Sequence, residues 1–218
     1  MSAEIVFVHG LYMTGAEAAF LRRRLAHELS ARTQAFHYRA TAEDPDLVAD
    51  RLARRIAALE GPVHLVGHSL GGLLILRALE RARRRALPLP PGRVVLLGSP
   101  VAGSDAAATL LRRPVLRRAL GRSGAVLAAA PAPRAGSACD GREIGVIAGS
   151  RPAGLGRFIA HFHEPNDGTV AVRETRYAGA ADSIVLPVSH TGMLLSRRVA
   201  LEAARFLRQG RFSLAASS

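Results

Sequence analysis

Six short apolar runs, separated by longer amphipathic stretches, constrain the fold of this chain more than any other feature of its sequence. Most of the runs are continuously apolar, which is typical of strands buried on both faces of a parallel sheet. They lie at residues 4–10, 33–40, 63–69, 93–100, 143–150 and 183–189. Helical patterns lie between and after them, at residues 16–30, 46–59, 71–86, 104–120 and 193–209. This alternation predicts an α/β fold, a three-layer sandwich of about six parallel strands with helices on both faces.

A single domain over residues 1–218 is expected, because a chain with 49% hydrophobic residues can bury one core of this size. The connection over residues 101–142 is too long for a simple crossover between strands. It contains a helical pattern and then a stretch rich in Ala, Pro and Gly. Because long insertions in such sheets are usually functional or mobile, we expect a small cap or lid over the site.

The formal net charge of +13 comes with 30 basic residues, all of them arginine. These arginines are spread over most of the expected helices, mostly where a solvated face would lie. No basic stripe interleaved with aromatic residues and no nucleic-acid motif accompanies them, so no nucleic-acid partner is expected. Weak contact between the arginines of the 101–130 stretch and an anionic membrane surface stays open.

The remaining bulk features point to an ordinary intracellular protein. Cys139 is the only cysteine, so no internal disulfide can form. No apolar run has the length of a membrane span, and the chain enters a strand almost at once without a basic leader. We therefore expect a cytoplasmic location.

The segment Gly67-His68-Ser69-Leu70-Gly71 carries the most specific chemical signal. A Gly-x-Ser-x-Gly sequence between a strand and a helix is typical of a nucleophile elbow, in which the serine sits on a strained turn. The two glycines relieve crowding around that turn. The start of the following helix adds positive partial charge near the reacting carbonyl oxygen. Ser69 is therefore predicted to be a nucleophile.

The motifs "VFVHGLYMTG", "LVGHSLGG", "LLGSPVAGS", "PNDGTV" and "VSHTG" occur in this order over nearly the whole chain. In them the chain resembles the α/β-hydrolase superfamily, and most of all its small bacterial lipase- and esterase-like members. The resemblance implies acyl-bond hydrolysis through a Ser–Asp–His triad. It also implies an oxyanion hole formed by the backbone N–H groups of Leu11 and Leu70.

The expected strand order, 2-1-3-4-5-6, makes such a site plausible. Strands 1 and 3 are then neighbours at the point where the winding reverses, and ligands bind in the crevice beyond that point. Leu11 and Ser69 would lie on either side of the crevice. His9 is expected to tie down the loop before Leu11 rather than to take protons.

His190 is the preferred general base among the eight histidines. It follows the last expected strand and precedes the last helix, and its small neighbours suit an exposed loop. His161 and His163 are the alternatives. His68, beside the nucleophile, is expected to point elsewhere.

Asp167 is the preferred triad acid, because the order Ser69, Asp167, His190 matches the order in the family. Its neighbours in "PNDGTV" favour a turn whose N–H groups can hold the carboxylate. Asp105, which follows the fourth expected strand, is the alternative.

A metal site made of His161, His163 and Asp167 is a weaker possibility. A His-x-His pair on a connection, without a second cluster of ligands, is a poor metal signature. We expect no metal and no cofactor.

These residues together predict a serine hydrolase that cleaves small-molecule or lipid esters through an acyl-enzyme, a carboxylesterase or lipase. A thioesterase or acyltransferase with the same triad is the alternative, and an inactive binding module of the same fold is a further one. Tyr12 and Met13 are expected to line the mouth of the site. Apolar candidates for an acyl wall are Val101, Leu110, Leu111, Val115, Leu116, Val126 and Leu127.

Overall fold

The computed structural model describes residues 2–112, 114–128, 141–153 and 164–213, and these residues form a six-stranded parallel sheet. The strands are β1 (Glu4–Val8), β2 (Arg32–Phe36), β3 (Val63–His68), β4 (Val94–Leu97), β5 (Ile144–Gly149) and β6 (Asp182–Leu186). Their spatial order is β2-β1-β3-β4-β5-β6, and every pair of neighbours is parallel. The strand order expected from the sequence is confirmed.

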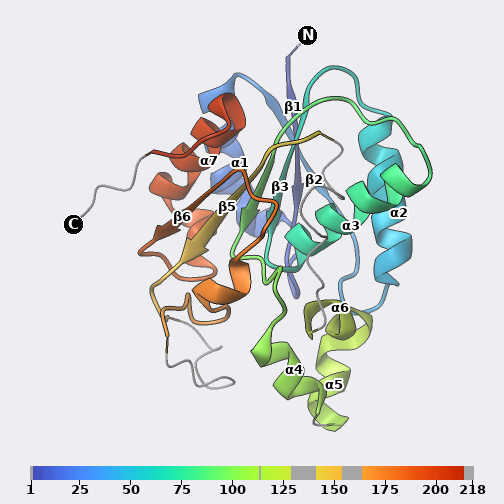
Figure 1. Cartoon of the computed structure of the whole chain (residues 1–218), viewed down its shortest axis with the longest axis vertical. Helices are drawn as coiled ribbons and strands as arrows, with labels where there is room; N and C mark the ends of the chain where they lie inside the picture. The colour runs from blue at the N-terminus through green and yellow to red at the C-terminus, as the bar shows by residue number, and fades with distance from the viewer. Residues whose placement is uncertain (1, 113, 129–140, 154–163, 214–218) are drawn as a thin grey trace.

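Helices cover both faces of the sheet (Figure 1). One face carries α2 (Pro45–Ala57) and α3 (Leu70–Arg84), which pack against each other. The opposite face carries α1 (Ala19–Leu29) and α7 (Arg197–Gln209), which also form a pair. The result is the three-layer sandwich that the alternation of patterns predicted.

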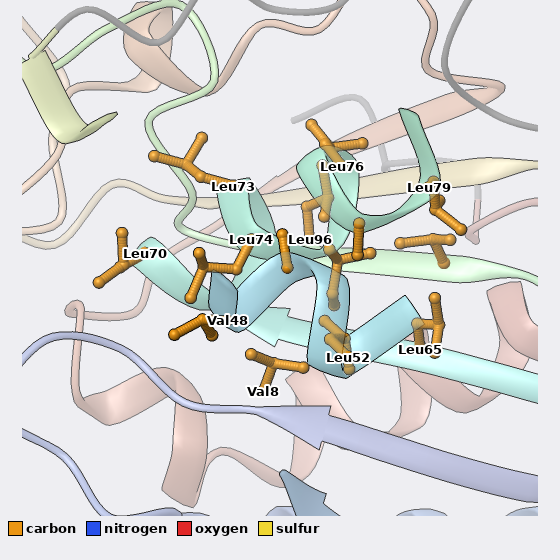
Figure 2. Packing of buried hydrophobic residues seen from close by; sticks show 14 of the residues in the cluster. Val8, Val48, Leu52, Leu65, Leu70, Leu73, Leu74, Leu76, Leu79 and Leu96 are labelled. Carbon is orange, nitrogen blue, oxygen red and sulfur yellow. The ribbon is translucent and has the colours of Figure 1, made fainter. Parts of the chain in front are cut away.

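A hydrophobic core fills each side of the sheet. Figure 2 shows the side under α2 and α3, where Val48 and Leu52 of α2 lie near Val8 of β1. On the other side, Phe7 of β1 and Phe206 of α7 belong to a second cluster. Strands β1, β4 and β5 are buried along their whole length and are almost entirely apolar, whereas the edge strands β2 and β6 are partly exposed and carry polar residues. A fully buried apolar side chain contributes about 1.5–3 kcal/mol relative to an exposed one.

The insertion between β4 and β5 begins with three short helices, α4 (Asp105–Leu111), α5 (Pro114–Leu120) and α6 (Gly124–Ala128). A single helix over 104–120 was expected, and this was wrong. Pro114 can begin a helix but cannot continue one, because it lacks the N–H group and its ring crowds the preceding turn. In Figure 1 these helices lie beyond the carboxyl ends of the strands.

The insertion is tied to the loops that follow β1 and β2. The Tyr12 hydroxyl donates a hydrogen bond to Ala119 O. The Ser123 hydroxyl donates to Ala40 O, and the Arg122 N–H donates to Thr41 O at 3.0 Å. These bonds seat the segment 119–123 against both loops.

The last helix also begins later than expected. Residues 192–195 form a short 3₁₀ turn, and α7 starts at Arg197. Ser196 caps α7, because its hydroxyl accepts from the Val199 N–H at 3.3 Å. In the described ranges, no helix combines the length and the apolarity that crossing a bilayer requires.

Candidate active site

Ser69 lies on a sharp turn between β3 and α3, and its backbone angles are φ 55° and ψ −123°. An L-residue in such a sparsely populated region costs on the order of 1–3 kcal/mol. Glycines make the turn possible: a Cβ at Gly67 would lie 2.5 Å from Gly72 Cα, and one at Gly71 would overlap Val8 O. The Ser69 N–H donates to Leu97 O at 2.9 Å. The space beside the two glycines and the hydrogen bond to Leu97 therefore allow and hold this turn. Ser69 is 8% exposed.

Asp167 and His190 meet through a hydrogen bond of 2.7 Å between Asp167 Oδ2 and His190 Nδ1. Asp167 is fully buried, with 0% of its surface exposed. Because an ionised carboxylate only accepts, Nδ1 carries the proton and Nε2 of a neutral ring is free to take one. The sequence-based choice of these two residues thus corresponds to a direct contact.

The loop around Asp167 supplies further donors to its carboxylate. Asp167 Oδ1 accepts from the N–H groups of Thr169 at 2.9 Å and Val170 at 2.7 Å. The His190 N–H donates to Asp167 O at 2.9 Å, which joins the two loops through their backbones as well. Such an arrangement fixes the orientation of the carboxylate.

Asp105 is not brought to His190. Its side chain is 65% exposed and pairs with Arg173. Its backbone N–H donates to Glu174 Oε1 at 2.7 Å, at the start of α4. Asp105 therefore belongs to the contact between the insertion and the loop after Asp167. Burial raises the pKa of Glu174 at that contact.

His68 contacts His190, although sequence analysis expected it to point elsewhere. His68 Nε2 lies 2.9 Å from His190 O, so Nε2 carries a proton and donates it. The two rings are 4.6 Å apart between centroids. Burial lowers the pKa of His68 to about 3, so the ring is neutral at pH 7. The sequence alone gives no signal that the residue before Ser69 contacts His190.

Gly98 is a second residue that sequence reasoning missed. It has φ +54°, and a Cβ there would lie 3.0 Å from Asp167 Oδ2 and 3.1 Å from His190 Nδ1. The position therefore requires glycine both for its backbone angle and for the space beside the Asp–His pair. Its place directly after β4, in "LLGSP", is the signal that could have pointed to it.

The loop after β1 passes close to Ser69. A Cβ at Gly10 would lie 3.1 Å from Ser69 Cβ, so glycine permits the approach. Within the part of the chain that the structure describes, no acceptor is bonded to the backbone N–H of Leu11 or Leu70. Two free N–H groups from these loops suit the binding of an anionic oxygen.

His9 anchors this loop. Its Nδ1 donates to Gly10 O at 2.9 Å, and its ring stacks on Tyr38 with 4.2 Å between centroids. The Tyr38 hydroxyl donates to His9 O at 2.7 Å. Burial lowers the pKa of His9, so the ring stays neutral and fixes the loop.

Tyr12 and Met13 line a cavity of about 470 Å³ between the loops after β1 and β2. Among the acyl-wall candidates, Val101 is fully buried in the core, and Leu110 and Leu111 pack half-buried against the same cluster. Val101 therefore presents no surface to a ligand in this conformation.

The structure gives no support to the alternative of a metal site formed by His161, His163 and Asp167. His161 and His163 lie outside the described residues. Among the residues that are described, no three His, Cys, Asp or Glu side chains gather in a way that could hold a metal ion.

Comparisons with known proteins extend these observations. The model of the alpha/beta hydrolase family matches residues 5–215. The structure is similar to a Bacillus licheniformis lipase in its mature form, with TM-score 0.73, 19% identity and coverage of 94% of this chain and 90% of the lipase. It is also similar to a metagenomic carboxyl esterase, with TM-score 0.69, 16% identity and coverage of 96% and 76%.

A third similar structure is a thioesterase from the prodiginine biosynthetic pathway of Streptomyces coelicolor. Its TM-score is 0.61 at 16% identity, with 93% of this chain and 89% of the thioesterase covered. At such identities these likenesses concern the fold alone. No curated protein matches the sequence.

Proposed function

Because this chain belongs to the α/β-hydrolase family, we propose that it is a serine hydrolase that cleaves carboxylic esters through an acyl-enzyme intermediate. The observation that carries the proposal is the buried hydrogen bond of 2.7 Å between Asp167 and His190. It lies beyond the carboxyl ends of the strands, as does the strained turn at Ser69. Nucleophile, base and acid of the proposed triad are Ser69, His190 and Asp167.

The chemistry follows from these positions. Ser69 Oγ attacks the ester carbonyl carbon while His190 Nε2 takes the hydroxyl proton, and the carbonyl oxygen becomes negative. The backbone N–H groups of Leu11 and Leu70 stabilise that oxygen. When the intermediate collapses, His190 donates its proton to the departing alkoxide, which leaves as the alcohol. A water molecule, deprotonated by His190, then attacks the acyl-enzyme and releases the acid.

Asp167 serves the reaction through charge and orientation. Its fixed carboxylate holds the Nδ1–H tautomer of His190, so that Nε2 is the atom that accepts the serine proton. It also stabilises the imidazolium cation that forms after proton transfer. Two backbone N–H groups and the His190 ring donate to the Asp167 carboxylate and fix its orientation.

We assign the insertion from residue 101 to 142 the role of a cap over this site. The support is its seat on Tyr12, Ala40 and Thr41, next to the loop that carries Leu11. Gly121, with φ +55°, allows this seat, because a Cβ there would overlap Thr41 O. A cap in this place controls access of a small-molecule or lipid ester to Ser69.

The proposal is tested with p-nitrophenyl esters of increasing acyl length. The native chain hydrolyses at least one of them, and Ser69→Ala loses that activity while its far-UV circular dichroism stays native. A fluorophosphonate probe labels Ser69 in the native chain. Turnover by Ser69→Ala at the native rate, or a native chain that neither reacts with the probe nor hydrolyses any ester, overturns the proposal.

Thioester hydrolysis is the second candidate, since one structure of similar fold is a thioesterase. The same triad serves both reactions, because the serine attacks an acyl carbon in either case. Comparison of butyryl-coenzyme A with p-nitrophenyl butyrate separates them. A kcat/KM at least tenfold higher for the thioester, a free-energy difference of about 1.4 kcal/mol, assigns the enzyme to thioesters.

A further inference from the structure

The cavity beside the oxyanion loop has two well-fixed walls. It lies between residues 9–14, which follow β1, and residues 37–43, which follow β2. His37 Nδ1 donates to Thr14 O at 3.0 Å and so ties one wall to the other. The insertion bonds to Tyr12, Ala40 and Thr41, three of the lining residues. The cavity is thus built by three segments that are distant in sequence.

Its floor consists of uncharged groups. His9, Tyr38, Met13 and Ala40 are among the lining residues, and the rings of His9 and Tyr38 stack on each other. Burial lowers the pKa of His9 and raises the pKa of Tyr38, so both rings are neutral at pH 7. An aliphatic or thioether-like part of a ligand can therefore contact these uncharged groups without displacing a charged group from water.

One wall carries more guanidinium groups than carboxylates. Arg39 and Glu43 both line the cavity, but the Glu43 carboxylate is already engaged by Arg51 at 2.6 Å and by the Arg39 backbone N–H at 2.6 Å. Among the described residues, no carboxylate lies within ion-pair distance of the Arg39 guanidinium. Two guanidinium groups thus face one carboxylate, and the wall keeps a positive charge.

Arg51 also fixes the wall from behind. Besides holding Glu43, it donates to His37 O at 3.1 Å and its guanidinium lies over the Phe36 ring at 5.3 Å. Because these contacts hold the backbone of residues 37–43, Arg39 projects from a loop that is already ordered. A guanidinium in such a place suits carboxylate and phosphate oxygens, which it can bind through two parallel N–H groups.

The cavity is close enough to the nucleophile to receive part of a substrate. Gly10, which packs against Ser69, directly follows His9 of the cavity floor. The loop of residues 9–12 therefore contacts Ser69 at one point and lines the cavity at others. At about 470 Å³ the space falls within the range of ordinary small-molecule sites.

We propose that this cavity is a substrate subsite in which Arg39 binds a carboxylate or phosphate group of the ester or thioester. The inference rests on the proposed function, because it needs an acyl substrate at Ser69. It narrows the substrate class to acyl compounds that carry a negative charge at a distance from the scissile bond. The charge can belong to the acyl chain or to the leaving group.

Two matched substrate pairs test the proposal. For a charge on the acyl side, the pair is p-nitrophenyl hydrogen glutarate, which ends in a carboxylate, and neutral p-nitrophenyl valerate. For a charge on the leaving group, it is butyryl-coenzyme A and neutral S-butyryl-N-acetylcysteamine. The quantity measured is the ratio of kcat/KM for the anionic substrate to kcat/KM for its neutral partner.

Arg39→Ala is expected to lower this ratio roughly five- to tenfold in at least one pair, and the pair that responds identifies the side that carries the charge. Added salt should shrink the difference between the native chain and the variant. The matched control is Arg23→Ala, which removes the same charge from the exposed face of α1 and leaves both ratios unchanged.

The two proposals fail in different ways. If the native chain hydrolyses neither the neutral nor the anionic substrates and does not react with the fluorophosphonate probe, the proposed function fails. If neutral substrates are hydrolysed and Arg39→Ala shifts neither ratio, or shifts them no more than Arg23→Ala does, the function stands and the subsite is refuted.

Discussion

His68 lies beneath His190, with its Nε2 2.9 Å from His190 O and its ring 4.6 Å from the His190 ring. The residue next to the proposed nucleophile thereby supports the loop that carries the proposed base. This contact crosses 122 positions of sequence, so only the folded sheet creates it. In the proposed mechanism this contact makes His68 a positioning residue rather than a participant in proton transfer.

Replacing His68 tests that role. His68→Leu removes the donor to His190 O, so we expect kcat to fall about tenfold or more and the apparent pKa of the kcat/KM profile to shift. His68→Gln can keep an N–H donor and should recover part of the loss. Steady-state kinetics between pH 5 and 9 measure both effects. Equal kcat and equal pH profiles for all three proteins would contradict the role.

The choice of acid is tested by a pair of isosteric substitutions. Asp167→Asn keeps the fold but removes the charge and favours the wrong tautomer of His190, so kcat should drop on the order of 10³–10⁴-fold. Asp105→Asn, at the exposed pair with Arg173, should change kcat less than about threefold. The reverse pattern in ester turnover would make Asp105 the acid.

Gly98→Ala tests the space beside the Asp–His pair. Its Cβ would crowd Asp167 Oδ2 at 3.0 Å, and its φ of +54° strains any L-residue, so both kcat and the free energy of unfolding should fall. Gly141→Ala is the matched control, because φ there is +74° but nothing lies within 4 Å of the new Cβ. Both variants should lose about 1 kcal/mol of stability, measured by urea unfolding. A loss of kcat in Gly98→Ala alone separates crowding from strain.

Stability should fall with acid between pH 6.5 and pH 4. Burial lowers the pKa of His68 to about 3 and that of His64 to about 4, from the ordinary 6.5. The unfolded chain then binds protons in this range that the folded chain does not, so stability is complete above pH 6.5 and decreases below it.

Each of these histidines contributes at most about 1.4 kcal/mol per pH unit to that slope. Urea unfolding at pH 7, 6 and 5 measures it, and His64→Gln should flatten it. His27→Gln, on the exposed surface of α1, serves as the control. A slope that His64→Gln leaves as steep as before would refute the assignment to His64.

The elements that sequence patterns predicted well are those that repeat a simple physical rule. Strands buried on both faces are apolar, so the six strands were predicted, and both the strands and their expected order are confirmed. The strands end earlier than expected, however: the run predicted to reach residue 40 stops at Phe36. Tyr38 and Ala40 remain buried in the core after the strand has ended, so the hydrophobic pattern does not mark where the strand stops.

The rest depended on tertiary contacts. Pro114 carried a visible signal for the break between α4 and α5. In contrast, folding alone creates the contact of His68 with His190. The same is true of the hydrogen bond between Arg51 and Glu43. Gly98 is an intermediate case. The sequence shows a glycine directly after a strand, but it does not show that this glycine lies beside Asp167 and His190.

The turn at Ser69 limits how robust this protein can become. Its φ of 55° belongs to a conformation that glycine adopts freely, so Ser69→Gly should raise the melting temperature while abolishing turnover. Catalytic turnover and thermal stability therefore make opposite demands on residue 69. Higher thermal stability therefore has to come from the packing of the sandwich or from its surface. Removing the strain at Ser69 would require replacing the proposed nucleophile.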